Sequence, residues 1–373
     1  MNDETMRVYW HDDCMLHDGG DSVLENEPPP CIVLPEPHVE TAMRILNIKG
    51  MLETGPLKDR IDLRIGRHAT DGEILTFHTP AYLEEIKAAN ANPKPVRIDG
   101  GGTVVADGTF EAAMAAAGTT LDAMDAVVNE PGGPVYSLVR PPGHHAQPTM
   151  GDGNCIYNNV ALAVESARSQ GVEKIAVIDW DVHHGNGTQA GFYDRSDVLT
   201  ISIHMNHGSW GPNHPELGLV EEIGSGAGIG FNRNVPLPYG VGNSCYEAIL
   251  ADLVTPLIDE FAPTVIVIAA GVDANAFDPN GRMVVTMDGF RRLGLIARDL
   301  AARHCDGRLL LVQEGGYSPT YTAYSAQGMI EGVLGLKEGL LIDPIAYYPD
   351  RSEHGLAVLP EIRSAWERAI ASA

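Results

Sequence analysis

The chain has 373 residues and is strongly acidic, with 50 aspartates and glutamates, 25 lysines and arginines, and a formal net charge of −25. A surface of this charge repels phosphate backbones, which argues against nucleic-acid binding, and it can attract a cationic partner. No segment reaches the roughly 18 apolar residues of a membrane helix, and the acidic start, MNDETMRVYWHDD, lacks a signal pattern. We therefore expect a cytoplasmic protein that contacts neither nucleic acid nor membrane.

The first hundred residues show little regular patterning. The segment ENEPPPCIVLPEP, residues 25–37, cannot form a regular helix and predicts a long loop braced by prolines. Neither an internal repeat nor a shift in composition divides the chain. We therefore expect one domain over residues 1–373.

From residue 108 onward, helical segments alternate with short apolar runs. Predicted helices cover residues 108–128, 158–170 with Gly171 as C-cap, and 288–304 with Asp288 as N-cap. The apolar runs are VYSLV (135–139), KIAVID (174–179), VLTISI (198–203), TVIVIAA (264–270) and RLLLVQ (308–313). Because they are apolar throughout rather than alternating, they predict strands covered on both faces. The order of elements predicts an α/β fold, with a parallel sheet between two helical layers.

Unusual residues follow four of these predicted strands. The chain continues into RPPGHHA after the first, WDVHHGNG after the second, GVDANAFDP after the fourth and EGGYSP after the fifth. In a parallel sheet, ligands bind beyond the carboxyl ends of the strands. We therefore expect these four segments to meet at one functional site.

A metal site is predicted from Asp181, His183 and Asp273. In extended chain, residues two apart project to the same face, so Asp181 and His183 can hold one ion. Asp273 supplies a third ligand from another strand, and three protein ligands with one open position are typical of catalytic zinc. Fe(II), Mn(II) and Co(II) are alternatives, of which the affinity order favours Zn(II). A buried Asp–His hydrogen bond without metal is the structural alternative.

The adjacent His144 and His145 are predicted to transfer protons. Each imidazole needs a partner on its second nitrogen, and Asp179 and Asn186 are the candidates. Tyr317 follows two glycines, which permit a close approach to substrate. We expect its phenol to donate a hydrogen bond to an oxyanion opposite the metal.

Five motifs in this order resemble the histone deacetylase superfamily, namely RPPGHHA, IDWDVHHGNGTQ, ISIHMNHGS, GVDANAFDP and EGGYSP. The segments PEPHVETAMRI and FHTPAYLEEI extend the resemblance over nearly the whole chain. It is closest to the class II branch and to bacterial histone-deacetylase-like amidohydrolases, including acetylpolyamine amidohydrolases. The resemblance implies a three-layer α/β/α arginase–deacetylase fold with a mainly parallel eight-stranded sheet. It also implies hydrolysis of an acylated amine at a single zinc ion.

Carried onto this sequence, the resemblance implies a role for each reactive residue. Asp181, His183 and Asp273 match the zinc ligands, and Tyr317 matches the catalytic tyrosine. His145 matches the general base. Asp179 matches the carboxylate that orients His144, and Asn186 replaces the carboxylate partner of His145. A structural potassium ion is implied at a set of five residues: Asp179, Asp181, His183, Ser202 and Ile203.

The expected substrate-binding residues depart from the family pattern at two positions. Beside Gly153, Asn154 stands where relatives with a lysine tunnel have an aromatic residue, and Asn280 stands where many have leucine. Trp210 can provide the opposite aromatic wall. A polar wall grips a methylene chain less well than an apolar one. We therefore expect a small polar amide or an acetylated polyamine as substrate.

Three alternative functions follow from the same residues. The first is deacetylation of acetyl-lysine in proteins by the same mechanism. The second is a dimanganese ureohydrolase, although such enzymes present Asp-x-Asp where this chain has Asp273-Ala274-Asn275. The third is a non-catalytic sensor of acyl groups. By analogy with bacterial relatives, we also expect a homo-oligomer, either a dimer or a tetramer.

Overall fold

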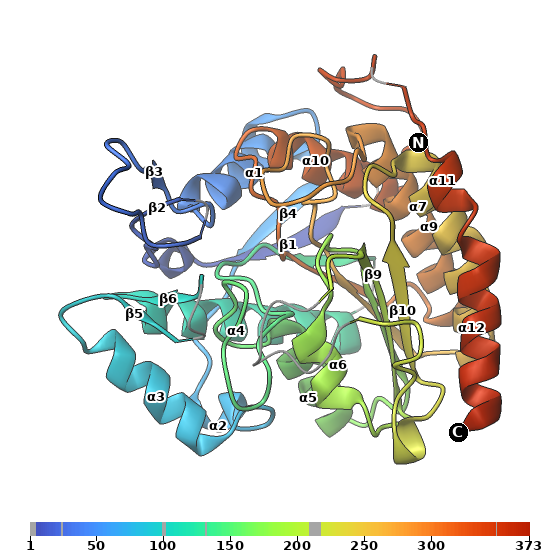
Figure 1. Ribbon diagram of the computed structural model, residues 1–373, viewed down its shortest axis with the longest axis horizontal. Coiled ribbons are helices and arrows are strands. Elements are labelled where there is room, and N and C mark those ends of the chain that lie inside the picture. Colours follow the sequence, from blue (N-terminus) through green and yellow to red (C-terminus); the bar gives the residue numbers. More distant parts are fainter. Residues whose placement is uncertain (1–4, 24, 99–101, 131–132, 209–217, 348) are drawn as a thin grey trace.

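The computed structural model describes residues 5–23, 25–98, 102–130, 133–208, 218–347 and 349–373, and its centre is an eight-stranded parallel sheet (Figure 1). The strand order is β10-β9-β8-β11-β12-β7-β1-β4. The strands are β1 (Met6–Trp10), β4 (Ile61–Ile65), β7 (Val135–Ser137), β8 (Ile175–Asp179), β9 (Val198–Met205), β10 (Asn232–Leu237), β11 (Val265–Ala269) and β12 (Leu309–Val312). Two short antiparallel pairs lie outside the sheet: β2 (Asp21–Ser22) with β3 (Glu36–Pro37), and β5 (Val96–Arg97) with β6 (Val104–Val105).

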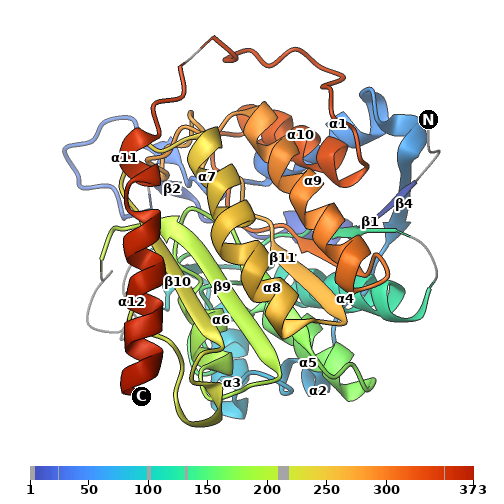
Figure 2. The ribbon, with the colours of Figure 1, turned by 90° about the vertical axis from the view of Figure 1, so that its right-hand side faces the viewer.

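Helices cover both faces of the sheet, as the apolar runs predict. One face packs against α1 (Ala42–Thr54), α7 (Asn243–Ile249), α8 (Thr255–Phe261), α9 (Met287–His304), α10 (Tyr321–Val333) and α12 (Leu359–Ser372) (Figure 2). The other packs against α4 (Thr109–Asn129), α5 (Asn159–Ser169) and α6 (Asn186–Phe192). Strand β8 shows the consequence, since Ala176 and Ile178 join the first core while Ile175 and Val177 join the second. The three-layer α/β/α prediction is confirmed.

Shorter helices complete the structure. These are α2 (Asp71–Ile74), α3 (Pro80–Asn90) and α11 (Glu353–Leu356), with 3-10 turns at Asp12–Met15, Lys58–Arg60 and Gly226–Gly228 and a π-helical segment at Leu250–Val254. Within the described ranges, no helix combines the length and the apolar character that a membrane span requires.

Most element boundaries agree with the sequence, and a few differ. Helix α9 begins at Met287 after Thr286, so the prediction of Asp288 as N-cap is wrong. The carboxylate of Asp288 instead accepts a hydrogen bond from Arg291 within the first turn. The predicted loop at 25–37 ends in strand β3 and is therefore not wholly irregular. Strands β1, β4 and β10 were not among the predicted strands.

A buried ion cluster ties the N-terminal segment to the carboxyl edge of the sheet. Glu40, just before α1, accepts hydrogen bonds from Arg44 and from Nε of Arg140, the latter at 2.9 Å. Arg44 also donates to the carbonyl oxygen of Glu314, beyond β12, at 2.6 Å. Burial alone raises the pKa of Glu40, but the two guanidinium groups overcome it and hold this pKa at about 2. The cluster thus fixes three chain segments that are distant in sequence.

Removing the carboxylate of this cluster is expected to destabilise the fold. Glu40→Gln leaves two buried guanidinium groups without a counter-charge, so the free energy of unfolding should fall by about 3 kcal/mol at pH 7. Because the pKa of Glu40 is depressed, this contribution is present above about pH 4.5 and is lost as the pH falls towards about 2. Urea unfolding at several pH values measures both effects.

Glu53→Gln serves as the matched control. Glu53 lies at the end of α1 and pairs with Lys49, but its side chain is 43% exposed. Loss of such an exposed pair should cost no more than about 0.5 kcal/mol. Equal destabilisation by the two variants would contradict the importance of the buried cluster.

Candidate active site

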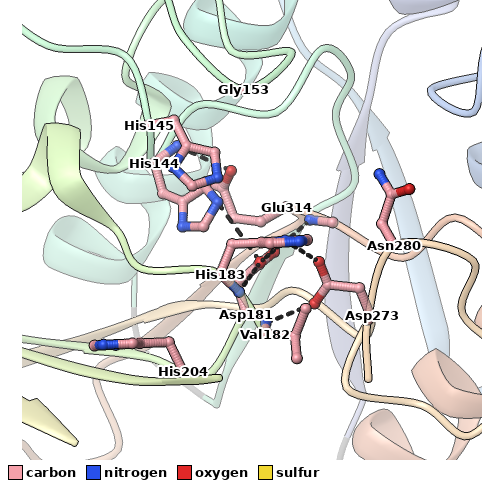
Figure 3. Close-up of polar contacts among 12 residues, drawn as sticks. His144, His145, Gly153, Asp181, Val182, His183, His204, Asp273, Asn280 and Glu314 are labelled. Carbon is pink, nitrogen blue, oxygen red and sulfur yellow. Dashed lines mark hydrogen bonds and ion pairs between the residues drawn. The ribbon is translucent and has the colours of Figure 1, made fainter. Parts of the chain in front are cut away.

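Four adjacent strands bring the predicted site residues together. Strands β8, β11, β12 and β7 are consecutive in the sheet, and their carboxyl ends face the same edge. The residues that follow them converge there (Figure 3). They are His144 and His145 after β7, Asp181 and His183 after β8, Asp273 after β11, and Glu314 and Tyr317 after β12.

Asp181, His183 and Asp273 form a compact buried cluster. Their candidate ligand atoms all lie within 4.8 Å of one another. Nδ1 of His183 is 3.0 Å from Oδ2 of Asp273 and 3.2 Å from Oδ1 of Asp181. Two carboxylates and one imidazole nitrogen at these separations, enclosed and shielded from water, fit a divalent cation. His184, by contrast, bonds to Gln189 away from this cluster.

The pKa values of the two aspartates are shifted because several ionisable groups are buried close together. Burial, with the neighbouring carboxylate of Asp181, raises the pKa of Asp273 to about 8. Burial also acts to raise the pKa of Asp181, but the positive charges of His144 and His183 reverse this and hold that pKa well below its usual range. Two buried carboxylates repel each other when both are ionised. A cation between them would remove that repulsion.

Backbone amides donate hydrogen bonds to the carboxylates of both Asp181 and Asp273. The amide of Gly315 donates to Oδ2 of Asp181 at 2.8 Å, and the amide of Val182 donates to Oδ1 of Asp273 at 2.7 Å. A Cβ atom at Gly315 would lie 2.3 Å from Oδ2 of Asp273, so only glycine permits this approach. The amides therefore fix how both carboxylates point.

The tandem histidines have the predicted partners. Nδ1 of His144 is 2.9 Å from Oδ2 of Asp179, and Nδ1 of His145 is 2.7 Å from Oδ1 of Asn186. The two rings lie 4.0 Å apart between centroids, and both are buried. Glu314 holds their loop, since its Oε2 accepts hydrogen bonds from the amides of Gly143 and His144.

The surroundings of the two histidines shift their pKa values in opposite directions. Burial lowers the pKa of His144, but the charges of Asp181 and Asp179 outweigh it and raise this pKa to about 10. The pKa of His145 falls well below 6.5 because the ring is buried and lies near the positive charges of His144 and His183. At neutral pH, His145 is therefore the neutral member of the pair.

A residue missed by sequence reasoning, Asp152, sets the orientation of Asn186. Nδ2 of Asn186 donates to Oδ2 of Asp152 at 2.9 Å, which turns Oδ1 of the amide towards His145. Oδ1 can only accept, so Nδ1 of His145 carries the proton and Nε2 keeps its lone pair. The only sequence signal for Asp152 was its place in the turn GDGNC, after the histidines.

Gly153 in the same turn packs directly against His145. Its φ is +49°, and a Cβ atom there would lie 2.4 Å from Cδ2 of the imidazole. A side chain would therefore displace the ring, so this position requires glycine for both its conformation and its contact.

Tyr317 is buried beside the cluster. Its ring centroid is 6.5 Å from that of His183, and its backbone amide donates to Asp278 at 2.6 Å. The guanidinium group of Arg44, also missed from the sequence, lies 4.8 Å from the centroid of the phenol ring. Burial raises the pKa of Tyr317 well above 10 despite the opposing effect of Arg44. The hydroxyl therefore stays protonated and able to donate.

A pocket of about 300 Å³ opens onto these groups. Its lining includes His145, His183 and Tyr317, the expected substrate-binding residues Gly153, Asn154 and Asn280, and Glu25, which sequence reasoning missed. The prediction for Trp210 falls on a residue outside the described ranges.

The predicted potassium site shares Asp181 and His183 with the cluster, and its other residues lie on β8 and β9. Strands β8 and β9 pair so that Asp179 lies opposite Ser202, with Ile203 next in the strand. Oδ1 of Asp179 accepts from the amide of Asp181 at 3.0 Å. Ser202 Oγ accepts from the amide of Gly185 at 3.3 Å.

Comparison with known proteins agrees with this architecture. Residues 38–333 match the family model of the histone deacetylase domain. The chain is 45% identical over 359 residues to "Histone deacetylase 8" of Arabidopsis thaliana, covering 96% of this chain and 95% of that protein. It is 40% identical over 314 residues to "Histone deacetylase-like amidohydrolase" of Pseudomonas aeruginosa, covering 83% and 80%.

More distant relatives share the domain. "Polyamine deacetylase HDAC10" of Homo sapiens is 34% identical over 319 residues, covering 84% of this chain and 47% of that protein. The crystal structure of the HDA15 HD domain superposes with a TM-score of 0.83 at 30% identity, covering 99% of this chain and 98% of that one. The sheet and its two helical layers are thus the arginase–deacetylase fold. The chain belongs to the histone deacetylase family, whose members include deacetylases and amidohydrolases.

Proposed function

We propose that this chain is a zinc-dependent hydrolase that cleaves the amide bond of a small or polar acylated amine. One juxtaposition supports this best. A neutral imidazole oriented through its Nδ1 and a protonated phenol line one pocket, together with His183 of the buried carboxylate–imidazole–carboxylate cluster. General base, metal ligands and oxyanion donor are the groups that amide hydrolysis requires.

Asp181, His183 and Asp273 would hold the zinc ion, which would polarise the substrate carbonyl and acidify a water molecule. His145 accepts the proton of the attacking water at Nε2, while Asn186 and Asp152 keep its Nδ1 protonated. The Tyr317 hydroxyl donates a hydrogen bond to the oxygen that becomes negative. The histidine pair supplies the proton for the leaving amine, and the charge of Asp179 supports His144 in its protonated form.

The dimanganese ureohydrolase is less well supported. Asn275 stands where that class has a second carboxylate, and its side chain is engaged within its own turn. Its Nδ2 donates to the carbonyl oxygen of Val272 at 2.7 Å, and its Oδ1 accepts from the amide of Phe277 at 2.9 Å. A non-catalytic acyl-group sensor would have no need of an oriented base such as His145.

Several finer points stay predictions. They include the potassium ion at Asp179, Asp181, His183, Ser202 and Ile203, the single domain over 1–373, the cytoplasmic location and the homo-oligomer. Small acylated amines are preferred as substrates over acetyl-lysine proteins because Asn154 and Asn280 make the pocket wall polar.

Metal removal tests the metal dependence of the reaction. Chelation should abolish hydrolysis of an acyl-coumarin amide, and Zn²⁺ should restore it, with one ion per chain by elemental analysis. Asp273→Asn should lower the zinc content severely, whereas Asp259→Asn, at a carboxylate exposed on α8, should leave it unchanged. Two ions per chain would favour the ureohydrolase, and a zinc-loaded protein inactive on every amide would favour the sensor.

Tyr317→Phe tests the oxyanion donor. Losing one such donor should lower kcat by about 100- to 1,000-fold, while zinc content and KM change little. Tyr324→Phe on α10 is the matched control and should retain wild-type turnover. Full activity of Tyr317→Phe would remove the phenol from the mechanism.

Asn186→Ala tests the orientation of His145. Without the amide, the ring loses the partner that fixes its tautomer, so kcat should fall by about 10- to 100-fold. Zinc content should stay at the wild-type level, because Asn186 does not contact the ligand atoms. Asn129→Ala, at an exposed amide on α4, is the control. A change of less than twofold in kcat for Asn186→Ala would contradict this role.

A further inference from the structure

Glu25 brings a carboxylate into the pocket from a remote part of the chain. It lies just after β2, whereas most other lining residues follow strands of the central sheet. Val23 and Asn26 exchange backbone hydrogen bonds of 2.9 and 3.1 Å, which close a tight turn around it. Arg97 donates to the carbonyl oxygen of Glu25 at 2.8 Å. The turn is therefore anchored to the rest of the protein.

Two amide side chains hold the carboxylate in place. Nδ2 of Asn154 donates to Oε1 of Glu25 at 2.8 Å, and Nδ2 of Asn280 donates to the same atom at 2.7 Å. These asparagines stand at the two positions where the sequence departs from the family pattern. A common contact thus accounts for both departures. Where the family pattern has apolar side chains, this pocket has two amide donors that hold the carboxylate of Glu25.

The donors fix the carboxylate without cancelling its charge. Asparagine is neutral, so neither donor brings a positive charge to the carboxylate of Glu25, as an arginine or lysine would. Among the described residues that line the pocket, Arg282 alone carries a permanent positive charge. Its guanidinium donates to the carbonyl oxygens of Pro279 and Gly281, at 2.8 and 2.6 Å. No described side chain donates a hydrogen bond to Oε2 of Glu25, and this oxygen lies beside Gly102, which has no side chain to cover it.

We propose that Glu25 binds a second, protonated amine of the substrate and so selects acylated diamines or polyamines over neutral amides. The substrate's amide lies at the inner end of the pocket and its free ammonium group lies against Oε2. A pocket of about 300 Å³ suits a slender small molecule. This selection rests on the proposed hydrolase function, whereas the binding of the amine itself does not.

A matched pair of substrates tests this assignment. N-(4-aminobutyl)acetamide and N-pentylacetamide have the same length and differ in the terminal ammonium group. In the wild type, kcat/KM should favour the charged compound, and this preference should weaken as salt is added. Glu25→Gln keeps the shape of the side chain and should lower the ratio of the two kcat/KM values by about 10- to 100-fold.

Two further variants make the result specific. Glu27→Gln removes an exposed carboxylate of the same loop, and the ratio should stay at its wild-type value. Asn280→Leu removes one of the two donors and should lower the ratio less than Glu25→Gln does. Thermal unfolding of each variant shows that the loop change has not unfolded the protein.

Other outcomes overturn the assignment. If Glu25→Gln raises kcat/KM equally for both compounds, Glu25 obstructs the pocket instead of binding an amine. If it lowers both equally, Glu25 only shapes the pocket. If the wild type prefers an acetyl-lysine peptide with flanking lysines and Glu25→Gln does not alter the ratio for the small pair, the acid serves protein substrates.

Binding of the free diamine separates this assignment from the hydrolase function. Calorimetry with 1,4-diaminobutane needs no turnover and should show binding to the wild type that weakens about tenfold or more in Glu25→Gln. A zinc-loaded protein that binds the diamine through Glu25 but hydrolyses no amide would refute the hydrolase function alone. Hydrolysis without Glu25-dependent binding would refute the amine site alone.

Discussion

The chemistry of this protein depends on two carboxylates buried within hydrogen-bonding distance of one imidazole. Asp181 and Asp273 repel each other, and burial together with this repulsion raises the pKa of Asp273. Water cannot relieve it because both side chains are fully buried. The sheet order enforces the encounter, since β8 and β11 are neighbours and each delivers one acid. Two acids held in this way fit a cation, which would relieve the repulsion between them.

The histidine pair shows how similar residues acquire different properties. His144 faces a full carboxylate, whereas His145 faces an amide that lies between it and Asp152. The carboxylate of Asp152 is therefore separated from His145 by Asn186. The amide of Asn186 still selects the tautomer of the imidazole. Environments that push two pKa values apart are what acid–base chemistry at neutral pH requires. Asn186 can accept a hydrogen bond from His145 as a carboxylate would, but it places no negative charge next to the ring.

The sequence predicted the central strands because each is buried on both faces and is apolar throughout. The three strands that it missed lack such a signal. β10 is an edge strand that contains Asn232, Asn234 and Pro236, and an edge position tolerates the proline. β4 is the opposite edge and is half-buried, and β1 lies in the irregular N-terminal region.

Motif residues were predictable because they follow strands at fixed places, but their supporting partners were not. Local sequence patterns do not reveal the contacts through which Asp152, Arg44 and Glu25 act. Arg44 reaches Glu314 across 270 positions, and Glu25 reaches Asn280 across 255. Only the folded chain brings such residues together. The asparagines at 154 and 280 were visible in the sequence, but their common partner was not.

The amides of Gly315 and Val182 occupy one oxygen of Asp181 and one of Asp273 respectively. The amide of His183 also donates to Oδ1 of Asp181, at 3.0 Å. Backbone amides thus contact both oxygens of Asp181 and one oxygen of Asp273. The orientation of the two acids is therefore set by peptide groups, which a change of a neighbouring side chain does not remove.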